Sequence, residues 1–475
     1  MVEFTDRKEE LGTLKERFEK LRRGELIVLY GRRRVGKTEL VSRFLNGIPS
    51  EQKAYLLIDE GTSADMLRSV SEDISIAWPE VRREFRSWED FFSFLAARAQ
   101  DRRTVIAIDE FQRMHSDRRA LTRFQKAWDT QLRNLPIMVI FLGSAVGAIH
   151  KIAINGKSPL FGRTTGRFRL QPFTYQTFRK ALGPSDEEQL IRLYTIFGGM
   201  PSYLEFAEKC LKSHDYIPVL ENTMLHKNGL LRDEPQALLR MELKDAGRYN
   251  SILAAIAEGY RNPKEISDQT GIEPGPLVFY LIKLEDYLGI IRKIVPLCGK
   301  HRPQYVFRDN LFAFWYRFVY RNMSSLEIEN YDHVKERIRN EIGTMEGRVF
   351  EDISRELLTA YNGKNIKGVP LSFTEIGAWW GRKEGDIDIV ATGKDSLLVG
   401  EVKYTNEPVD SDVPIELEHR LSFLNCSSSQ RSNVRFLVIS KSGFTEPAKK
   451  YMEERKMLAL ALEDMTELFD SLPLK

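Results

Sequence analysis

The chain alternates between short apolar runs and longer stretches in which apolar positions recur every three or four residues. Residues 25–30, 104–108 and 137–142 are short, mostly apolar runs without strict alternation. Such runs are typical of strands buried on both faces, as in a parallel sheet covered by helices. Residues 39–45 carry helical spacing soon after the first run. The pattern predicts an α/β fold for the first part of the chain.

A glycine-rich loop joins the first predicted strand to the helix that follows. Its spacing is Gly-x-x-x-x-Gly-Lys-Thr at residues 31–38. Glycines let backbone N–H groups turn onto phosphates, and the helix amino terminus adds positive potential. We expect Lys37 to reach the β- and γ-phosphates of ATP and the Thr38 hydroxyl to ligate Mg²⁺. The predicted nucleotide contacts are Gly31, Arg32, Arg33, Arg34, Val35, Gly36, Lys37 and Thr38.

Two carboxylates, Asp109 and Glu110, end the second apolar run. We expect Asp109 to complete the Mg²⁺ shell and Glu110 to polarise the attacking water. Further along, Arg163 stands in a predicted loop. It could reach a phosphate within the chain or across a subunit boundary, and a solvated surface arginine explains it equally well.

The middle of the chain has the pattern of three short helices and a hairpin. The predicted helices are 249–257, 264–271 and 276–285, and the predicted strands are 289–295 and 304–308. This order is typical of a winged helix-turn-helix. The third helix carries acidic residues beside its lysine, which suits base reading poorly, and the hairpin is the more basic surface. DNA contact and a structural or regulatory role are equally well supported.

Acidic and apolar residues alternate at 384–391, and a turn leads to an apolar run at 396–403. We expect these two strands to form an antiparallel hairpin that brings Asp388 beside Glu401 and Lys403.

Carboxylate oxygens in such an arrangement suit Mg²⁺ or Mn²⁺. Asp388 and Glu401, with the backbone carbonyl that follows Glu401, are the predicted ligands. Glu351 on an upstream helix completes the predicted shell, with Glu346 as a fallback. Lys403 would orient or deprotonate the water that attacks a phosphodiester, or stabilise the charge that develops.

Several features together resemble the archaeal ATPase family allied to the STAND and AAA+ NTPases. In chain order they are Phe4-x-Asp6-Arg7, the loop at 31–38, Ile108-Asp109-Glu110-Phe111 and Pro159-Leu-Phe-Gly-Arg163. The resemblance spans essentially the whole chain and implies a P-loop ATPase with a helical lid. In AAA-like ATPases a polar residue at the end of a strand such as 137–142 senses the γ-phosphate, which implies this role for Ser144.

Two further segments resemble parts of known families. Gly198-Gly-Met-Pro201 resembles a lid segment whose proline approaches the adenine, so Pro201 is an expected nucleotide contact; such a segment is also a routine turn. Asp388, Glu401-x-Lys403 and Glu351 resemble the PD-(D/E)xK nuclease fold, with Ile387 where proline would stand. This implies a restriction-endonuclease-like α/β domain that either cleaves or survives as a binding platform.

Composition adds limits to this picture. The 475 residues predict about three globular domains. The net charge of +3 gives nucleic-acid binding little support by itself, and the three cysteines have neither metal nor disulfide spacing. No run approaches the roughly 18 apolar residues of a membrane span, and the amino terminus lacks the apolar core of a signal peptide. We therefore expect a cytoplasmic protein without a membrane contact.

The patterns predict an α/β multidomain chain. We expect an ATPase core at 1–174, a helical lid at 175–244, a winged helix at 245–322, a helical linker at 323–342 and a nuclease-like domain at 343–475. The leading hypothesis is an ATP-dependent protein of DNA processing or defence that carries a metal-dependent nuclease. The alternative is a STAND-like ATP/ADP signalling switch, and a transcription regulator is a third reading. A homo-oligomer fits each of them.

Overall fold

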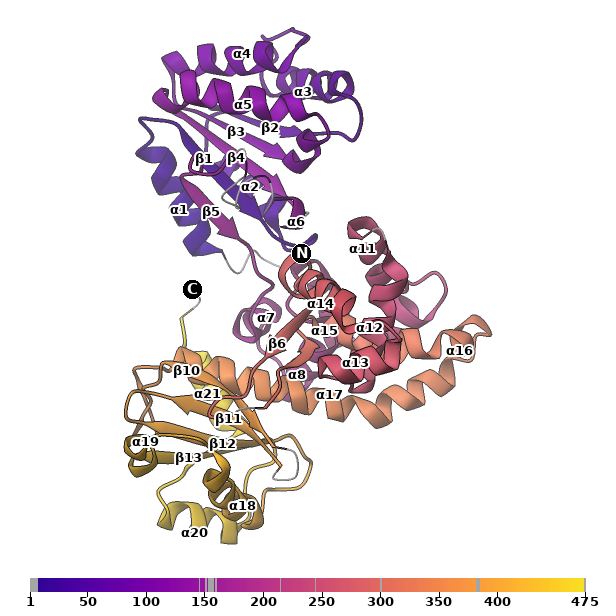
Figure 1. Ribbon diagram of the computed structural model, residues 1–475, viewed down its shortest axis with the longest axis vertical. Coiled ribbons are helices and arrows are strands. Elements are labelled where there is room, and N and C mark those ends of the chain that lie inside the picture. The colour runs from indigo at the N-terminus through magenta and orange to yellow at the C-terminus, as the bar shows by residue number, and fades with distance from the viewer. Residues whose placement is uncertain are drawn as a thin grey trace.

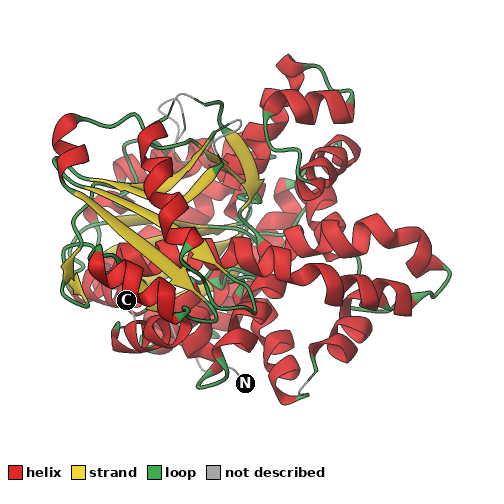
Figure 2. Ribbon diagram, turned by 90° about the horizontal axis from the view of Figure 1, so that it is seen from below, coloured by secondary structure: helices red, strands yellow, loops and turns green. Residues whose placement is uncertain are grey.

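The computed structural model describes residues 7–144, 146–149, 152, 158, 160–213, 215–243, 245–299, 301–381 and 385–473. Two five-stranded sheets lie toward opposite ends of the molecule, with a helical region between them (Figure 1). Figure 2 shows that helices flank the strands and make up most of the molecule. Among the described helices, none is both long and apolar enough to cross a membrane.

The first sheet, called the P-loop sheet below, is entirely parallel. Its strands are β1 (Glu25–Tyr30), β2 (Lys53–Leu57), β3 (Thr104–Asp109), β4 (Ile137–Gly143) and β5 (Gly166–Arg169), in the order β2-β3-β4-β1-β5. The strands predicted from the three apolar runs are confirmed as β1, β3 and β4. All residues of β3 and β4 are buried, as their lack of alternation indicated.

Helices cover both faces of the P-loop sheet. They are α1 (Lys8–Glu19) and α2 (Lys37–Asn46) on one face, and α3 (Ser63–Ala77), α4 (Trp88–Asp101) and α5 (Arg118–Thr130) on the other. Along β1, Ile27 and Leu29 pack with the first pair, whereas Leu26 and Val28 pack with the other three. The central strands β1, β3 and β4 therefore supply two separate cores.

The central helical region follows, over residues 175–327. Its helices are α7 (Tyr175–Leu182), α8 (Glu187–Phe197), α9 (Leu204–Lys212), α10 (Tyr216–Leu220), α11 (Glu234–Glu242), α12 (Ala246–Glu258), α13 (Pro263–Thr270), α14 (Pro274–Ile282), α15 (Asn310–Phe314) and α16 (Met323–Glu327). A short α6 (Val146–Ile149) precedes it. The expected hairpin is present as β6 (Ile291–Ile294) paired antiparallel with β7 (Gln304–Phe307).

The second sheet, called the C-terminal sheet, is mixed. Its strands are β10 (Glu375–Trp380), β11 (Asp386–Thr392), β12 (Leu397–Lys403), β13 (Val434–Ser440) and β14 (Leu458–Ala461), in that spatial order. The predicted antiparallel pairing of β11 with β12 is confirmed, with Ile389 opposite Gly400. β12, β13 and β14 pair in parallel.

Helices also cover the C-terminal sheet. They are the 30-residue α17 (Tyr331–Ala360) and α21 (Leu462–Ser471) on one face, and α18 (Asp412–Arg420) and α20 (Glu446–Glu454) on the other. The short α19 (Ser428–Ser432) and the small pair β8 (Asn365–Ile366) and β9 (Val369–Pro370) complete this part of the chain. α17 is continuous across the expected boundary between linker and last domain at residue 343.

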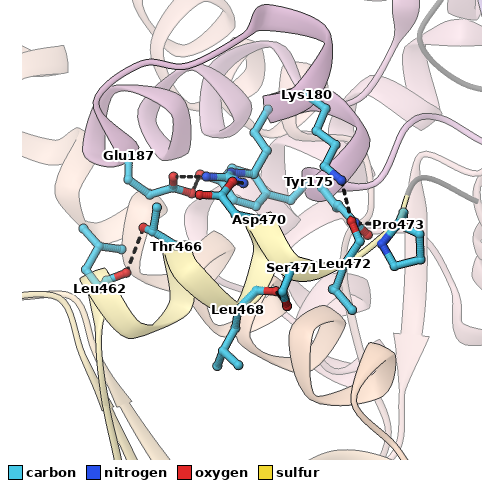
Figure 3. A network of polar contacts seen from close by, with 12 residues as sticks. Tyr175, Lys180, Glu187, Leu462, Thr466, Leu468, Asp470, Ser471, Leu472 and Pro473 are labelled. Atoms are coloured by element: carbon cyan, nitrogen blue, oxygen red, sulfur yellow. Dashed lines mark hydrogen bonds and ion pairs between the residues drawn. The ribbon is translucent and has the colours of Figure 1, made fainter.

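The helix α21 returns to the central helical region (Figure 3). Arg179 on α7 donates to Asp470 on α21 at 2.7 Å and to Glu187 on α8 at 2.8 Å. The Phe469 ring packs edge-on against Tyr175, with 5.5 Å between ring centroids. Both polar and apolar contacts thus fasten the C-terminal sheet to α7 and α8.

Candidate functional site

The loop between β1 and α2 has the conformation that its glycines require. Gly36, which precedes α2, has φ of 90°, a left-handed conformation that favours glycine. A Cβ at Gly31 would lie 2.6 Å from the carbonyl oxygen of Leu170, so only glycine fits there. Val35 is buried beneath the loop. The backbone of the loop is therefore free to turn its N–H groups outward.

The Lys37 side chain is folded back over this loop. Its ammonium donates to the carbonyl oxygens of Gly31 at 2.9 Å and Arg32 at 3.0 Å, and the residue is only 8% exposed. Burial lowers the pKa of Lys37 to about 8, although the charges of Asp109 and Glu110 act in the opposite direction. A phosphate in the loop would give this cation a better partner than two neutral carbonyls.

Thr38 and Asp109 meet, as a shared Mg²⁺ site would require. The Thr38 hydroxyl lies 3.3 Å from Asp109 Oδ2, and the Tyr55 hydroxyl also donates to Asp109. Burial and the hydrogen bond to Asp109 raise the pKa of Tyr55. The oxygens of Thr38 and Asp109 suit Mg²⁺ in type and position. Tyr55 was missed because β2 is short and its residues give no motif.

Glu110 is held by two neighbours. The Ser144 hydroxyl donates to Glu110 Oε1 at 3.1 Å, and the Gln112 amide donates to Oε2. Glu110 itself has φ of 52°. The sensor role expected of Ser144 stays a prediction, and its contact in the structure is with the carboxylate expected to polarise water.

Arg163 lies at the edge of the P-loop sheet away from the loop. β5 begins at Gly166, opposite Ile27 near the start of β1, whereas the loop follows the end of β1. Arg163 forms an ion pair with Asp129 at 2.7 Å. A strand of six residues, about 20 Å, thus separates Arg163 from the phosphate loop in this structure, and its contact with a phosphate within the chain stays a prediction. A role across a subunit boundary stays a prediction.

Carboxylates of the central helical region hold the arginines of the loop. Arg32 pairs with Asp309, Arg33 lies 3.7 Å from Glu242, and Arg34 lies 2.8 Å from Glu234. These carboxylates come from α11 and from the residue that caps α15.

Pro201 also lies against the phosphate loop. A Cβ at Gly36 would be 3.9 Å from its ring. The segment expected to approach the nucleotide thus borders the loop, and its contact with adenine stays a prediction.

The second candidate site lies where β11 and β12 meet α17. Asp388 Oδ2 accepts a hydrogen bond from the Val402 backbone N–H at 2.9 Å. Burial raises the pKa of Asp388 to about 7, and the charges of Glu401 and Glu351 add to this effect. The structure therefore brings the three predicted carboxylates into one electrostatic neighbourhood.

Two cations neutralise Glu401, which is 5% exposed. Lys403 lies 2.6 Å from Oε1, and Arg420 of α18 lies 3.0 Å from Oε2. Arg420 and Arg355, which donates to the Asp388 carbonyl at 2.6 Å, were not foreseen.

Glu351, and not the fallback Glu346, is the acidic residue of α17 near this site. Glu351 lies 3.4 Å from Arg355, and its charge acts on Asp388. Glu346 is buried in an ion pair with Arg192 of α8 at 2.6 Å.

The described residues include no group of three or more His, Cys, Asp or Glu side chains arranged to hold a metal ion. At the second site, Lys403 and Arg420 occupy the oxygens of Glu401 that a metal would need. The donor set nevertheless fits a hard cation in type, because burial raises the pKa of Asp388 and Glu351, and a positive charge between the carboxylates would stabilise their ionised form.

The connection between β6 and β7 packs on the C-terminal sheet. The Leu297 N–H donates to the Ala378 carbonyl on β10 at 2.9 Å, and the Asn425 N–H donates to the Cys298 carbonyl at 2.8 Å. The C-terminal sheet therefore holds the connection at residues 297–298, and contact of the hairpin's basic residues with DNA stays a prediction.

Comparisons with known proteins cover both parts of the chain. A family model described as an ATPase domain predominantly from Archaea matches residues 4–206. A second, described as Archaea bacterial proteins of unknown function, matches residues 315–414.

Individual relatives agree with these matches. An uncharacterized protein of Methanocaldococcus jannaschii is 32% identical over 407 residues, covering 84% of this chain and 87% of its own. An uncharacterized ATP-binding protein of the same organism is 51% identical over 45 residues, 10% of this chain and 75% of its own. A Walker-type ATPase of Pyrococcus abyssi shares the fold, with a TM-score of 0.52 and 24% identity over 66% of this chain and 96% of its own.

Proposed function

We propose that this chain, which belongs to the archaeal ATPase family, uses ATP bound at residues 31–38 to control a metal-dependent nuclease centre on the C-terminal sheet. The proposed substrate is DNA, in DNA processing or defence. The proposal divides the chain into an ATPase core at 1–174, a helical lid at 175–244, a winged helix at 245–322, a helical linker at 323–342 and a nuclease-like domain at 343–475.

The contact between Thr38 and Asp109 supports the nucleotide part of the proposal. Both would ligate Mg²⁺, which neutralises phosphate charge during transfer. Lys37 would exchange its two backbone carbonyls for the β- and γ-phosphates. Glu110, oriented by Ser144, would accept a proton from the attacking water.

The buried carboxylate of Asp388 carries the nuclease part of the proposal. Burial, with the charges of Glu401 and Glu351, raises its pKa to about 7, and perturbed carboxylates of this kind are typical of functional sites. Asp388 and Glu401 would hold Mg²⁺ or Mn²⁺, which activates water and polarises a phosphodiester. Lys403, released from Glu401, would orient that water or stabilise the developing charge.

The test is cleavage of linear, circular and single-stranded DNA with Mg²⁺ or Mn²⁺, with and without ATP. We expect Lys403→Ala to lose cleavage while keeping ATP hydrolysis, and Lys37→Ala to lose ATP hydrolysis and the effect of ATP on cleavage. Lys449→Ala is the matched control, because Lys449 is an exposed lysine on the same domain. Cleavage that persists in Lys403→Ala would reject the assigned centre.

A signalling switch is the second candidate, and the three ion pairs of the loop arginines favour it. They join the nucleotide loop directly to α11 and to the cap of α15, so a bound nucleotide competes with carboxylates of the central helical region. In this reading the C-terminal domain is a binding platform that does not cleave. ATP hydrolysis without cleavage of any DNA, together with slow release of ADP, would favour the switch.

A further inference from the structure

A cavity of about 1050 Å³ joins the two candidate sites. Its wall is formed by the hairpin β6–β7, the helix α17 and the strands β10 and β11, which lie close together in Figure 1. It extends from Arg32 on the phosphate loop to Asp388. The candidate nuclease residues therefore open into a space that the central helical region helps to enclose.

Most cations of this cavity already have partners. Arg32 pairs with Asp309, and Arg292 and Arg355 share Asp352 at 2.5 and 2.7 Å.

Arg261 and Arg348 differ from these cations. Within the described part of the chain, neither side chain makes a hydrogen bond or ion pair. They come from different segments, since Arg261 lies between α12 and α13 and Arg348 lies on α17.

These two arginines lie close to one another and to the carboxylates. Burial lowers the pKa of Arg348 to about 10, and the charge of Arg261 adds to this effect. Glu351, Asp386 and Asp388 line the same cavity as the two arginines. The Arg261 backbone is held by the Tyr305 N–H at 2.8 Å, so its position follows the hairpin.

Two arginines that line one cavity without an ion-pair partner form a typical site for a phosphate. The cavity has the size of a pocket that takes a small ligand, and a duplex about 20 Å wide would not enter it. Within this space, the arginines lie beside the carboxylates that would face a reacting phosphodiester.

We propose that Arg261 and Arg348 bind a backbone phosphate of a single-stranded nucleic acid segment and seat its neighbouring phosphodiester over Asp388. The inference rests on the proposed nuclease function and deepens it in two respects. It names an unpaired strand or a frayed end as the form of substrate, and it makes the central helical region, through Arg261, part of the substrate site. Arg261 and Arg348 act here as positioning residues.

The experiment measures binding of a fluorescent oligothymidylate and of a blunt duplex by the full chain. Ca²⁺ replaces Mg²⁺ so that binding is observed without cleavage. Arg261→Gln and Arg348→Gln are each expected to weaken binding of the single strand roughly tenfold. Each should also reduce the slope of log K against log salt by about 0.7, because one phosphate contact is lost.

Two controls separate positioning from folding. Arg302→Gln removes an exposed arginine of the hairpin connection outside the cavity and should change neither affinity nor salt slope. ATP hydrolysis should remain at the wild-type rate in both cavity variants, since neither residue contacts the phosphate loop. The thermal midpoint of Arg348→Gln should not fall, because the charge removed has no ion-pair partner and lies near the like charge of Arg261.

The outcomes distinguish the two proposals. Wild-type cleavage with unchanged affinity and salt slope in both cavity variants would overturn the inference and leave the nuclease intact. Tighter binding of the duplex, or an equal loss in Arg302→Gln, would also overturn it. Absence of both binding and cleavage by the wild type would reject the nuclease function and the inference with it.

Discussion

At the scale of single residues, Asp109 receives the hydroxyl groups of both Thr38 and Tyr55. Its other oxygen accepts the Glu110 N–H at 2.7 Å. The carboxylate is thus oriented from several sides, which is typical of a group that ligates a metal ion.

The Tyr55→Phe variant tests this orientation. Loss of the hydroxyl should raise the Mg²⁺ concentration needed for half-maximal ATP hydrolysis about tenfold, because partners of a ligating carboxylate tune metal affinity. A Mg²⁺ titration of the hydrolysis rate measures it. Tyr451→Phe, which removes a hydroxyl from the C-terminal domain, is the control. An unchanged Mg²⁺ requirement would mean that Tyr55 only supports the fold.

The Asp388→Asn variant tests the buried carboxylate. The folded pKa of Asp388 is about 7, above the ordinary value of about 3.9, so charged Asp388 disfavours the folded state. The stability that comes from protonated Asp388 is complete below pH 4 and is lost as pH rises to 7.

Asparagine keeps the neutral form at every pH. Without added metal, the variant should therefore gain stability over the wild type between pH 4 and 7, by up to about 4 kcal/mol, and the difference should level off above pH 7. Urea unfolding at several pH values, followed in the C-terminal domain, measures this. A difference that does not change with pH would show that the wild-type carboxylate titrates normally.

The candidate residues that belong to a motif were predictable, and those that depend on packing were not. Lys37, Thr38 and Asp109 follow from local spacing because one loop and one strand end position them. Arg420 is 19 positions from Glu401 on an ordinary helix. Its contact depends on how α18 packs on the sheet, which no local pattern describes. The same holds for Tyr55.

At the scale of elements, the apolar pattern predicted individual strands and helices more reliably than it predicted which elements pack against each other. The three apolar runs, the hairpin β6–β7 and the pairing of β11 with β12 were expected. The edge strands β2 and β5 were missed because they are short and mixed in composition. The packing of the β6–β7 connection on β10 is a long-range contact, which no local sequence pattern indicates.

The helix α11 brings a negative charge to the nucleotide loop. Glu242 lies 3.7 Å from Arg33, and its charge also acts on Lys37. We expect Glu242→Gln to tighten ATP binding about fivefold, because a carboxylate beside the phosphate position opposes the nucleotide. Titration with a fluorescent nucleotide measures it, and Glu258→Gln, at the exposed end of α12, is the control. Weaker binding would show that Glu242 instead shapes the loop for ATP.

At the scale of the whole molecule, Arg179 links α7, α8 and α21. Arg179→Met would leave Glu187, whose side chain is only 9% exposed, without its cation. We expect a loss of about 3 kcal/mol, because an uncompensated charge would remain buried. Asp470 is 66% exposed, so Asp470→Asn should cost less than about 1 kcal/mol. Equal losses in thermal unfolding would contradict this division.

The contact between α21 and α7 also constrains how the protein is made. Arg179 and Asp470 are 291 positions apart in the sequence. At roughly 5–20 residues per second, the ribosome therefore adds Asp470 about 15–60 s after Arg179. Tyr175 packs against Phe469, and nothing from α21 can cover it during that interval. A nascent chain on the ribosome therefore presents this surface of α7 and α8 to chaperones until residues 462–473 have emerged.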